Sequence, residues 1–69
     1  MIISKVKKLM EDAGVTYAEL ERVTGLSNQT ISRARGESIR ECSLATLEAI
    51  ASALGVMIVD LFEEVRSEK

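Results

Sequence analysis

Apolar residues recur every three or four positions along most of this 69-residue chain. That spacing is typical of helices that bury one face. An early run places five such residues on one stripe: Ile3, Val6, Leu9, Met10 and Ala13. A later run does the same with Leu44, Leu47, Ile50, Ala51 and Leu54. A weaker run follows with Ile58, Leu61, Phe62 and Val65, which predicts a last helix, although residues 56–59 also fit a short strand.

Three segments combine a capping residue with the apolar pair that often flanks a helix start. Thr16, Ser27 and Ser43 each stand where a hydroxyl can accept a hydrogen bond from an amide of the first helical turn. Glu19 stands where its carboxylate can reach back to the amide of Thr16. The flanking apolar pairs are Val15 with Leu20, Leu26 with Ile31, and Cys42 with Leu47. These patterns predict the N-termini of three helices.

Glycines mark the ends of the periodic runs. Gly14 and Gly55 each follow a run where a left-handed residue commonly ends a helix, and Gly25 and Gly36 divide the middle of the chain. About five helical segments result. We therefore expect an all-α fold, a compact five-helix bundle that forms a single domain over residues 1–69.

The composition excludes most catalytic and metal chemistry. The chain has no His and a single Cys, Cys42. These are too few ligands for a structural zinc site, and the His-based nucleophile arrangements are absent. The adjacent acids Glu11-Asp12 and Glu63-Glu64 fall on faces expected to be exposed, where they act as solvating charge. We predict no enzyme activity, no metal and no cofactor, and an apolar packing role for Cys42.

No segment has the pattern of a membrane span or a secretion signal. The longest apolar stretch, residues 56–59, is far too short to cross a bilayer. Met1, Ile2 and Ile3 are followed by lysines instead of a longer apolar core. The expected location is the cytoplasm.

Charge is distributed unevenly along the chain. The formal net charge is −2, yet residues 1–40 hold seven Lys and Arg against five Asp and Glu, whereas residues 41–69 hold two against six. The first part can therefore face a polyanion while the second part keeps the molecule soluble. Random scatter of surface charge explains the same numbers equally well.

Two short helices over residues 17–24 and 28–35 are separated only by Gly25, Leu26 and Ser27. So tight a turn forces the helices to cross steeply. At about 100° per residue, Ile31 and Ala34 of the second helix share a narrow inward stripe. The region over about residues 16–35 is thus predicted to be a helix-turn-helix.

The outward side of the second predicted helix carries side chains that can read bases. Its polar residues are Asn28, Gln29, Ser32 and Arg33. Asn and Gln can pair with the exposed edge of adenine, and Arg with that of guanine, in a major groove wide enough for a helix. No carboxylate occurs from Arg22 through Arg35. Any small helix has a polar outer face, so these side chains alone do not indicate DNA binding. The polar row, the tight turn and the absence of acidic residues together favour a DNA-binding role.

Four stretches of the chain resemble a known family. They are residues 15–20, 25–33, 43–47 and 53–56, reading VTYAEL, GLSNQTISR, SLATL and ALGV. They are similar in order and spacing to helix-turn-helix proteins of the Cro and phage-repressor type, also called the xenobiotic-response-element (XRE) family. The similarity extends over about residues 5–64. It implies a lambda-repressor-like five-helix DNA-binding domain that binds a two-fold-related operator as a dimer.

The resemblance also implies roles for individual residues. Base contacts fall at Asn28, Gln29 and Arg33, with Ser32 beside them. Phosphate contacts fall at Thr16, Tyr17, Ser27, Arg35 and Arg40. Lys5, Lys7 and Lys8 are candidates for flanking contacts, with an ordinary solvated face as the equal alternative.

The last predicted helix is more apolar than a monomer requires. We hypothesise that Met57, Val59 and Phe62, together with Ile58 and Val65, contribute to a homodimer contact. Additional core packing is the competing explanation, and it suits Ile58 and Phe62 better.

The sequence thus predicts a double-stranded-DNA-binding transcriptional regulator, a repressor that acts as a homodimer and is controlled by its concentration or by a regulatory protein partner. The alternative is a protein-interaction module of the same fold, such as an antitoxin or a bridging factor. Steep salt dependence would distinguish DNA binding from that alternative.

Overall fold

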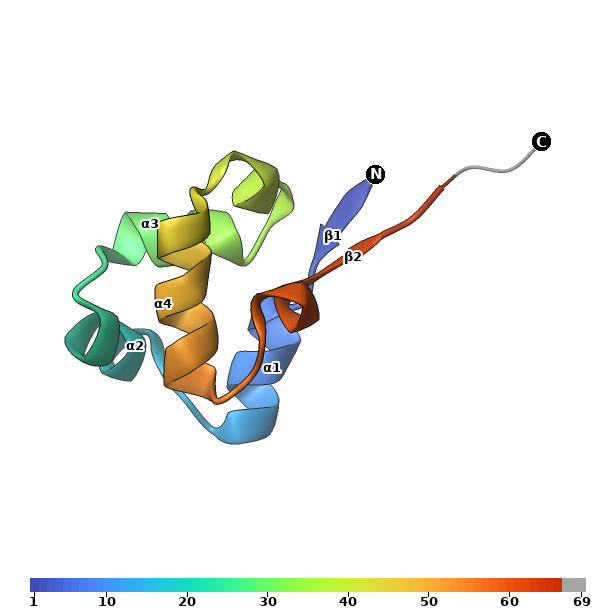
Figure 1. Cartoon of the computed structure of the whole chain (residues 1–69). Coiled ribbons are helices and arrows are strands. Elements are labelled where there is room, and N and C mark those ends of the chain that lie inside the picture. The colour runs from blue at the N-terminus through green and yellow to red at the C-terminus, as the bar shows by residue number, and fades with distance from the viewer. Residues whose placement is uncertain (67–69) are drawn as a thin grey trace.

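The computed structural model describes residues 1–66, and within them four α-helices form most of the fold (Figure 1). The helices are α1 (Val6–Ala13), α2 (Tyr17–Thr24), α3 (Asn28–Ala34) and α4 (Leu44–Leu54). Two 3₁₀ helices, η1 (Glu37–Glu41) and η2 (Ile58–Leu61), follow α3 and α4 respectively. Two short strands, β1 (Ile2–Ser4) and β2 (Phe62–Glu64), lie near the two ends of the chain.

The predicted helix starts are confirmed by hydrogen bonds. The Thr16 hydroxyl accepts from the amide of Glu19 at 3.2 Å, and the amide of Thr16 donates to the Glu19 carboxylate at 3.3 Å. Ser27 accepts from the Thr30 amide at 3.2 Å, and Ser43 from the Thr46 amide at 3.1 Å. Each hydroxyl therefore satisfies an amide that has no partner inside its own helix.

The core forms around α4, which runs between the α2–α3 pair and α1 (Figure 1). It contains side chains from every helix. The fully buried large residues are Val6, Leu20, Ile31, Ile39, Ile50 and Leu61. Val15, Leu26 and Cys42, the apolar residues that precede three helix starts, pack against this core. No polar or charged side chain is buried among the described residues, so the core is held by apolar packing.

The expectation of an all-α, five-helix bundle is corrected at both ends of the chain. Ile3 belongs to β1 instead of the first helix, which begins at Val6. β1 pairs antiparallel with β2 in the register Ile2↔Glu64, Ile3↔Glu63 and Ser4↔Phe62. Helical spacing cannot be distinguished from extended chain over so few residues, and the strand forms because its partner comes from the other end of the sequence.

The predicted last helix is reduced to a single turn. Ile58–Leu61 forms η2, whose start is held by the Met57 amide donating to the Asp60 carboxylate at 3.0 Å. Phe62 then adopts an extended conformation and begins β2. The alternative strand over residues 56–59 does not form either. The single turn of η2 buries Leu61. The residues that follow it pair with β1 as a strand, so the helix does not continue.

Among the described residues, no helix combines the length and the apolar character that crossing a bilayer requires.

Candidate nucleic-acid interface

The turn between α2 and α3 is built from local hydrogen bonds. Gly25 adopts a left-handed conformation with φ of +76°, and its amide donates to the carbonyl of Glu21 at 2.8 Å. The Thr24 hydroxyl donates to the carbonyl of Leu20 and accepts from the amide of Leu26 at 3.1 Å. The chain therefore reverses within three residues, and α3 crosses α2 closely, as the helix-turn-helix prediction requires.

The orientation of α3 follows from its two apolar residues. Ile31 and Ala34 are completely buried, so one narrow side of this seven-residue helix faces the core. The four predicted base-contacting residues, Asn28, Gln29, Ser32 and Arg33, are all exposed. The fold thus brings them together on the outer side of α3, where forked donors and acceptors can meet base edges.

The start of α2 and the end of α3 lie against each other. The guanidinium carbon of Arg35 is 4.5 Å from the centre of the Tyr17 ring, a stacked cation–π arrangement. The hydroxyl and amide of Thr16 are both used in the capping box, so the first-turn amides of Tyr17 and Ala18 remain for an outside acceptor. Amides at a helix start and a neighbouring guanidinium are groups that suit a phosphate.

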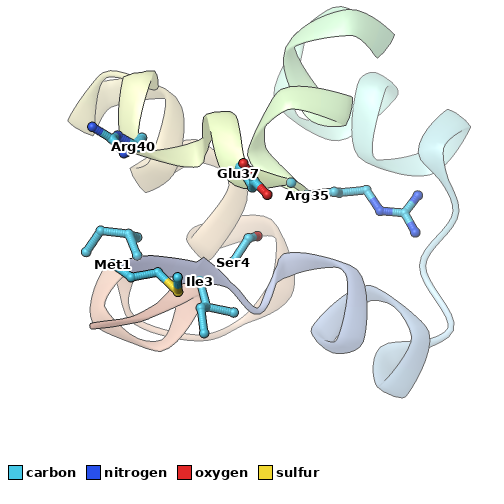
Figure 2. A pocket seen from close by; sticks show the side chains of 8 residues that line it. Met1, Ile3, Ser4, Arg35, Glu37 and Arg40 are labelled. Carbon is cyan, nitrogen blue, oxygen red and sulfur yellow. The ribbon is translucent and has the colours of Figure 1, made fainter. Parts of the chain in front are cut away.

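Arg40 lies in η1, away from this pair. It borders a groove of about 500 Å³ that runs between β1 and the segment from Arg35 to Arg40. Figure 2 shows the Arg35 and Arg40 side chains extending in opposite directions from this groove. Glu37 lies between them. Thr16, Tyr17 and Arg35 therefore lie together, and Arg40 lies apart from them.

Ser27, the remaining predicted phosphate contact, is the N-cap of α3.

The electrostatic environment of α3 is free of ion pairs within residues 1–66. Among the described residues, a salt bridge joins Lys8 to Asp12 at 3.7 Å on an exposed face of α1. No described carboxylate pairs with Arg33 or Arg35. Both guanidinium groups thus keep their charge available for another anion.

One residue that connects to α3 escaped the sequence analysis. The hydroxyl of Ser4 in β1 donates a hydrogen bond to the carbonyl of Ala34. The two residues are 30 positions apart, so no local pattern signals the contact. Thr24 was also missed, although a threonine directly before a turn glycine is a place where such a local hydrogen bond is common.

The residues of the hypothetical dimer contact fall in two places. Met57 and Val59 have exposed fractions of 71% and 68% and border a groove of about 430 Å³ against the end of α4. Phe62 is half-buried and lines a different groove, with Ile2 and Leu44. The structure therefore groups Met57 with Val59 and sets Phe62 apart.

No group of three or more metal-ligating side chains occurs within residues 1–66. Cys42 is half-buried, and its thiol donates a weak hydrogen bond to the carbonyl of Ser38 at 3.8 Å. Burial raises the pKa of this thiol above its ordinary value, and the side chain packs against the core.

Comparison with known proteins agrees with the geometry. No curated protein matches the chain. Residues 5–66 match the family model of the Cro/C1-type HTH DNA-binding domain, and the match includes every helix of the fold. The chain therefore belongs to the family of Cro/C1-type helix-turn-helix DNA-binding domains.

Proposed function

We propose that this protein is a sequence-specific transcriptional repressor that binds a two-fold-related operator in double-stranded DNA as a homodimer. The observation that carries the proposal is the exposed row of Asn28, Gln29, Ser32 and Arg33 on α3, a helix whose buried residues are Ile31 and Ala34. Membership of a DNA-binding family supports the same reading.

In this proposal α3 lies in the major groove and reads bases. The amides of Asn28 and Gln29 pair with adenine, and the guanidinium of Arg33 pairs with guanine. Ser32 lies between these positions and contacts either base type. Because the first and last residues of this row are separated by little more than one helical turn, each subunit reads only a few base pairs.

Phosphates hold the domain in register. The free amides of Tyr17 and Ala18 at the start of α2, with Arg35 beside them, take one phosphate, and the Thr16 hydroxyl donates to it the proton that the capping box leaves free. Two further phosphates of the DNA backbone are contacted by Ser27 at the start of α3 and by Arg40 in η1. These contacts supply affinity without sequence information, and the affinity depends on salt.

The homodimer contact is proposed at Met57 and Val59. Both side chains are largely exposed and apolar, and they border one groove. A contact centred there does not need Phe62, which packs on the core from another side. Joining two domains makes the second half-site contact intramolecular, so a dimer binds far more tightly than one subunit. Repression follows when the bound dimer occupies promoter DNA.

Selection of bound sequences from a pool of random duplexes tests the proposal directly. We expect a two-fold-symmetric consensus, with half-sites about one duplex turn apart. Binding should weaken steeply as salt rises. A pool with no enriched sequence, or binding that salt leaves unchanged, would contradict the proposal and favour a protein-interaction module.

The role of Arg33 is tested against a matched arginine. Arg33→Ala should lose about 1–3 kcal/mol of discrimination at one base position of the consensus. Arg66→Ala removes the same charge from an exposed residue beyond β2 and should leave the consensus unchanged. If Arg33→Ala and Arg66→Ala selected the same consensus, Arg33 would not be a base-contacting residue.

A further inference from the structure

Ser4 lies at the end of β1, where its half-buried hydroxyl joins two helices that are far apart in the sequence. The hydroxyl donates a hydrogen bond to the carbonyl oxygen of Ala34, the last residue of α3. It accepts one at 3.2 Å from the amide of Val6, the first residue of α1. The single proton of the hydroxyl is thus committed to α3.

The end of α3 differs from the ends of the other helices. α1, α2 and α4 each end at a glycine with φ between +68° and +76°, a conformation that closes the helix locally. α3 ends instead at Arg35, which has φ of −81° and remains right-handed. The last turn of α3 is closed by the amide of Arg35, which donates to the carbonyls of Ile31 and Ser32, and by the amide of Gly36, which donates to the carbonyl of Arg33. The carbonyl of Ala34 accepts its hydrogen bond from Ser4 in β1, a different part of the fold.

The two ends of α3 are held by different residues. Ser27 caps the first turn, next to Asn28 and Gln29. Ser4 holds the last turn, next to Arg33, together with the stack of Arg35 on Tyr17. Between them Ile31 and Ala34 are the buried residues of this short helix, so its contacts with the core lie on one narrow side.

We propose that Ser4 is a positioning residue for DNA recognition, whose hydroxyl fixes the last turn of α3 and thereby aims Arg33. Ser4 touches no base or phosphate in this role, and the inference rests on the proposed function, in which α3 reads the groove. Without the hydroxyl, Ser27 still holds the start of α3. Base preference is then lost at the Arg33 end of the half-site and kept at the Asn28 end.

Two variants of nearly equal shape test this role. Ser4→Thr keeps the hydroxyl, whereas Ser4→Val replaces it with a methyl group, and both add the same branch to the strand. We expect Ser4→Thr to bind DNA like the wild type. We expect Ser4→Val to bind about 2- to 10-fold more weakly, the factor that one hydrogen bond is worth. The loss should be concentrated at the base pair read by Arg33 in a panel of single-base operator variants.

The free protein gives a second measurement. In Ser4→Val, the amide resonances of Ala34 and Arg35 should shift, while those of Asn28 and Gln29 stay close to their wild-type positions. Ser4→Thr should show much smaller shifts at Ala34 and Arg35. Similar spectra for Ser4→Thr and Ser4→Val at the end of α3 would overturn the inference.

Ser43→Ala serves as the control for a general loss of stability. It removes a hydroxyl that caps α4, so it should lower the melting temperature without changing base preference. If the wild type binds specifically and Ser4→Val keeps its affinity and base preference, the inference is wrong and the proposed function stands. If the wild type binds no duplex, the proposed function fails, and the role of Ser4 in recognition fails with it.

Discussion

Arg35 and Tyr17 stack on each other, with the guanidinium carbon of the one 4.5 Å from the ring centre of the other. Tyr17 is the first residue of α2, and Arg35 follows the last residue of α3. The contact therefore closes the helix-turn-helix at the side opposite its turn. It places a cation beside the free amides at the start of α2.

The stack should contribute measurably to stability. We expect a coupling energy of about 0.5–1 kcal/mol between Tyr17→Leu and Arg35→Met in a double-mutant cycle, measured by denaturant unfolding of the free protein. Replacing Tyr17 by Leu keeps an apolar group against the core, so the cycle isolates the stacking. Additive effects of the two substitutions would show that the side chains do not interact in solution.

Two glycines near α3 should respond differently to alanine. Gly25 has φ of +76° and no atom within 4 Å of an added Cβ, so Gly25→Ala should cost about 1–2 kcal/mol through backbone strain alone. Gly36 has φ of −124°, and an added Cβ would meet only the Ser32 carbonyl oxygen at 4.0 Å. Gly36→Ala should be neutral or stabilise the fold by up to about 1 kcal/mol. Thermal unfolding of both variants measures the contrast, and equal losses would contradict this account of the turn.

The proposed dimer contact predicts an effect of charge at one exposed apolar residue and not at another. Val59→Asp should weaken self-association in sedimentation while circular dichroism stays unchanged. Leu44→Asp is the matched control, because Leu44 has an exposed fraction of 72% and borders a different groove. If Leu44→Asp weakened association and Val59→Asp did not, the contact would lie on the Leu44 side.

The raised pKa of the Cys42 thiol should make the free energy of unfolding depend on pH in the alkaline range. Burial raises the pKa of its thiol above the ordinary value of 9.0, against an opposing effect of Arg33. The folded state therefore keeps a proton that the unfolded state releases, so this contribution to stability is complete below about pH 9 and is lost as the pH rises further. Urea unfolding at neutral and alkaline pH should show a larger loss for the wild type than for Cys42→Ala.

The same burial should slow the reaction of Cys42 with iodoacetamide. We expect slower alkylation of the folded protein than of the urea-unfolded chain at the same pH, because the thiolate is the reacting form. Equal rates would show that the thiol is neither shielded nor shifted in the fold.

Much of the helix-turn-helix could be predicted because its causes are local. Ser27 caps α3 through an amide three residues away, and the spacing of Ile31 and Ala34 decides which side of that helix is buried. The exposure of Asn28 and Arg33 follows from that spacing. The terminal segments could not be predicted in the same way, because three residues of strand carry almost no periodic signal.

Local sequence was enough to predict the starts of α2, α3 and α4, the turn after α2 and the polar side chains that α3 presents, since each depends on residues within one or two helical turns. Three contacts became visible only in the folded molecule: the pairing of β1 with β2, the hydrogen bond from Ser4 to the end of α3, and the stack of Arg35 on Tyr17. Those contacts join residues separated by long stretches of chain. Forming such contacts closes long loops at a cost in chain entropy, so no pattern of neighbouring residues signals them.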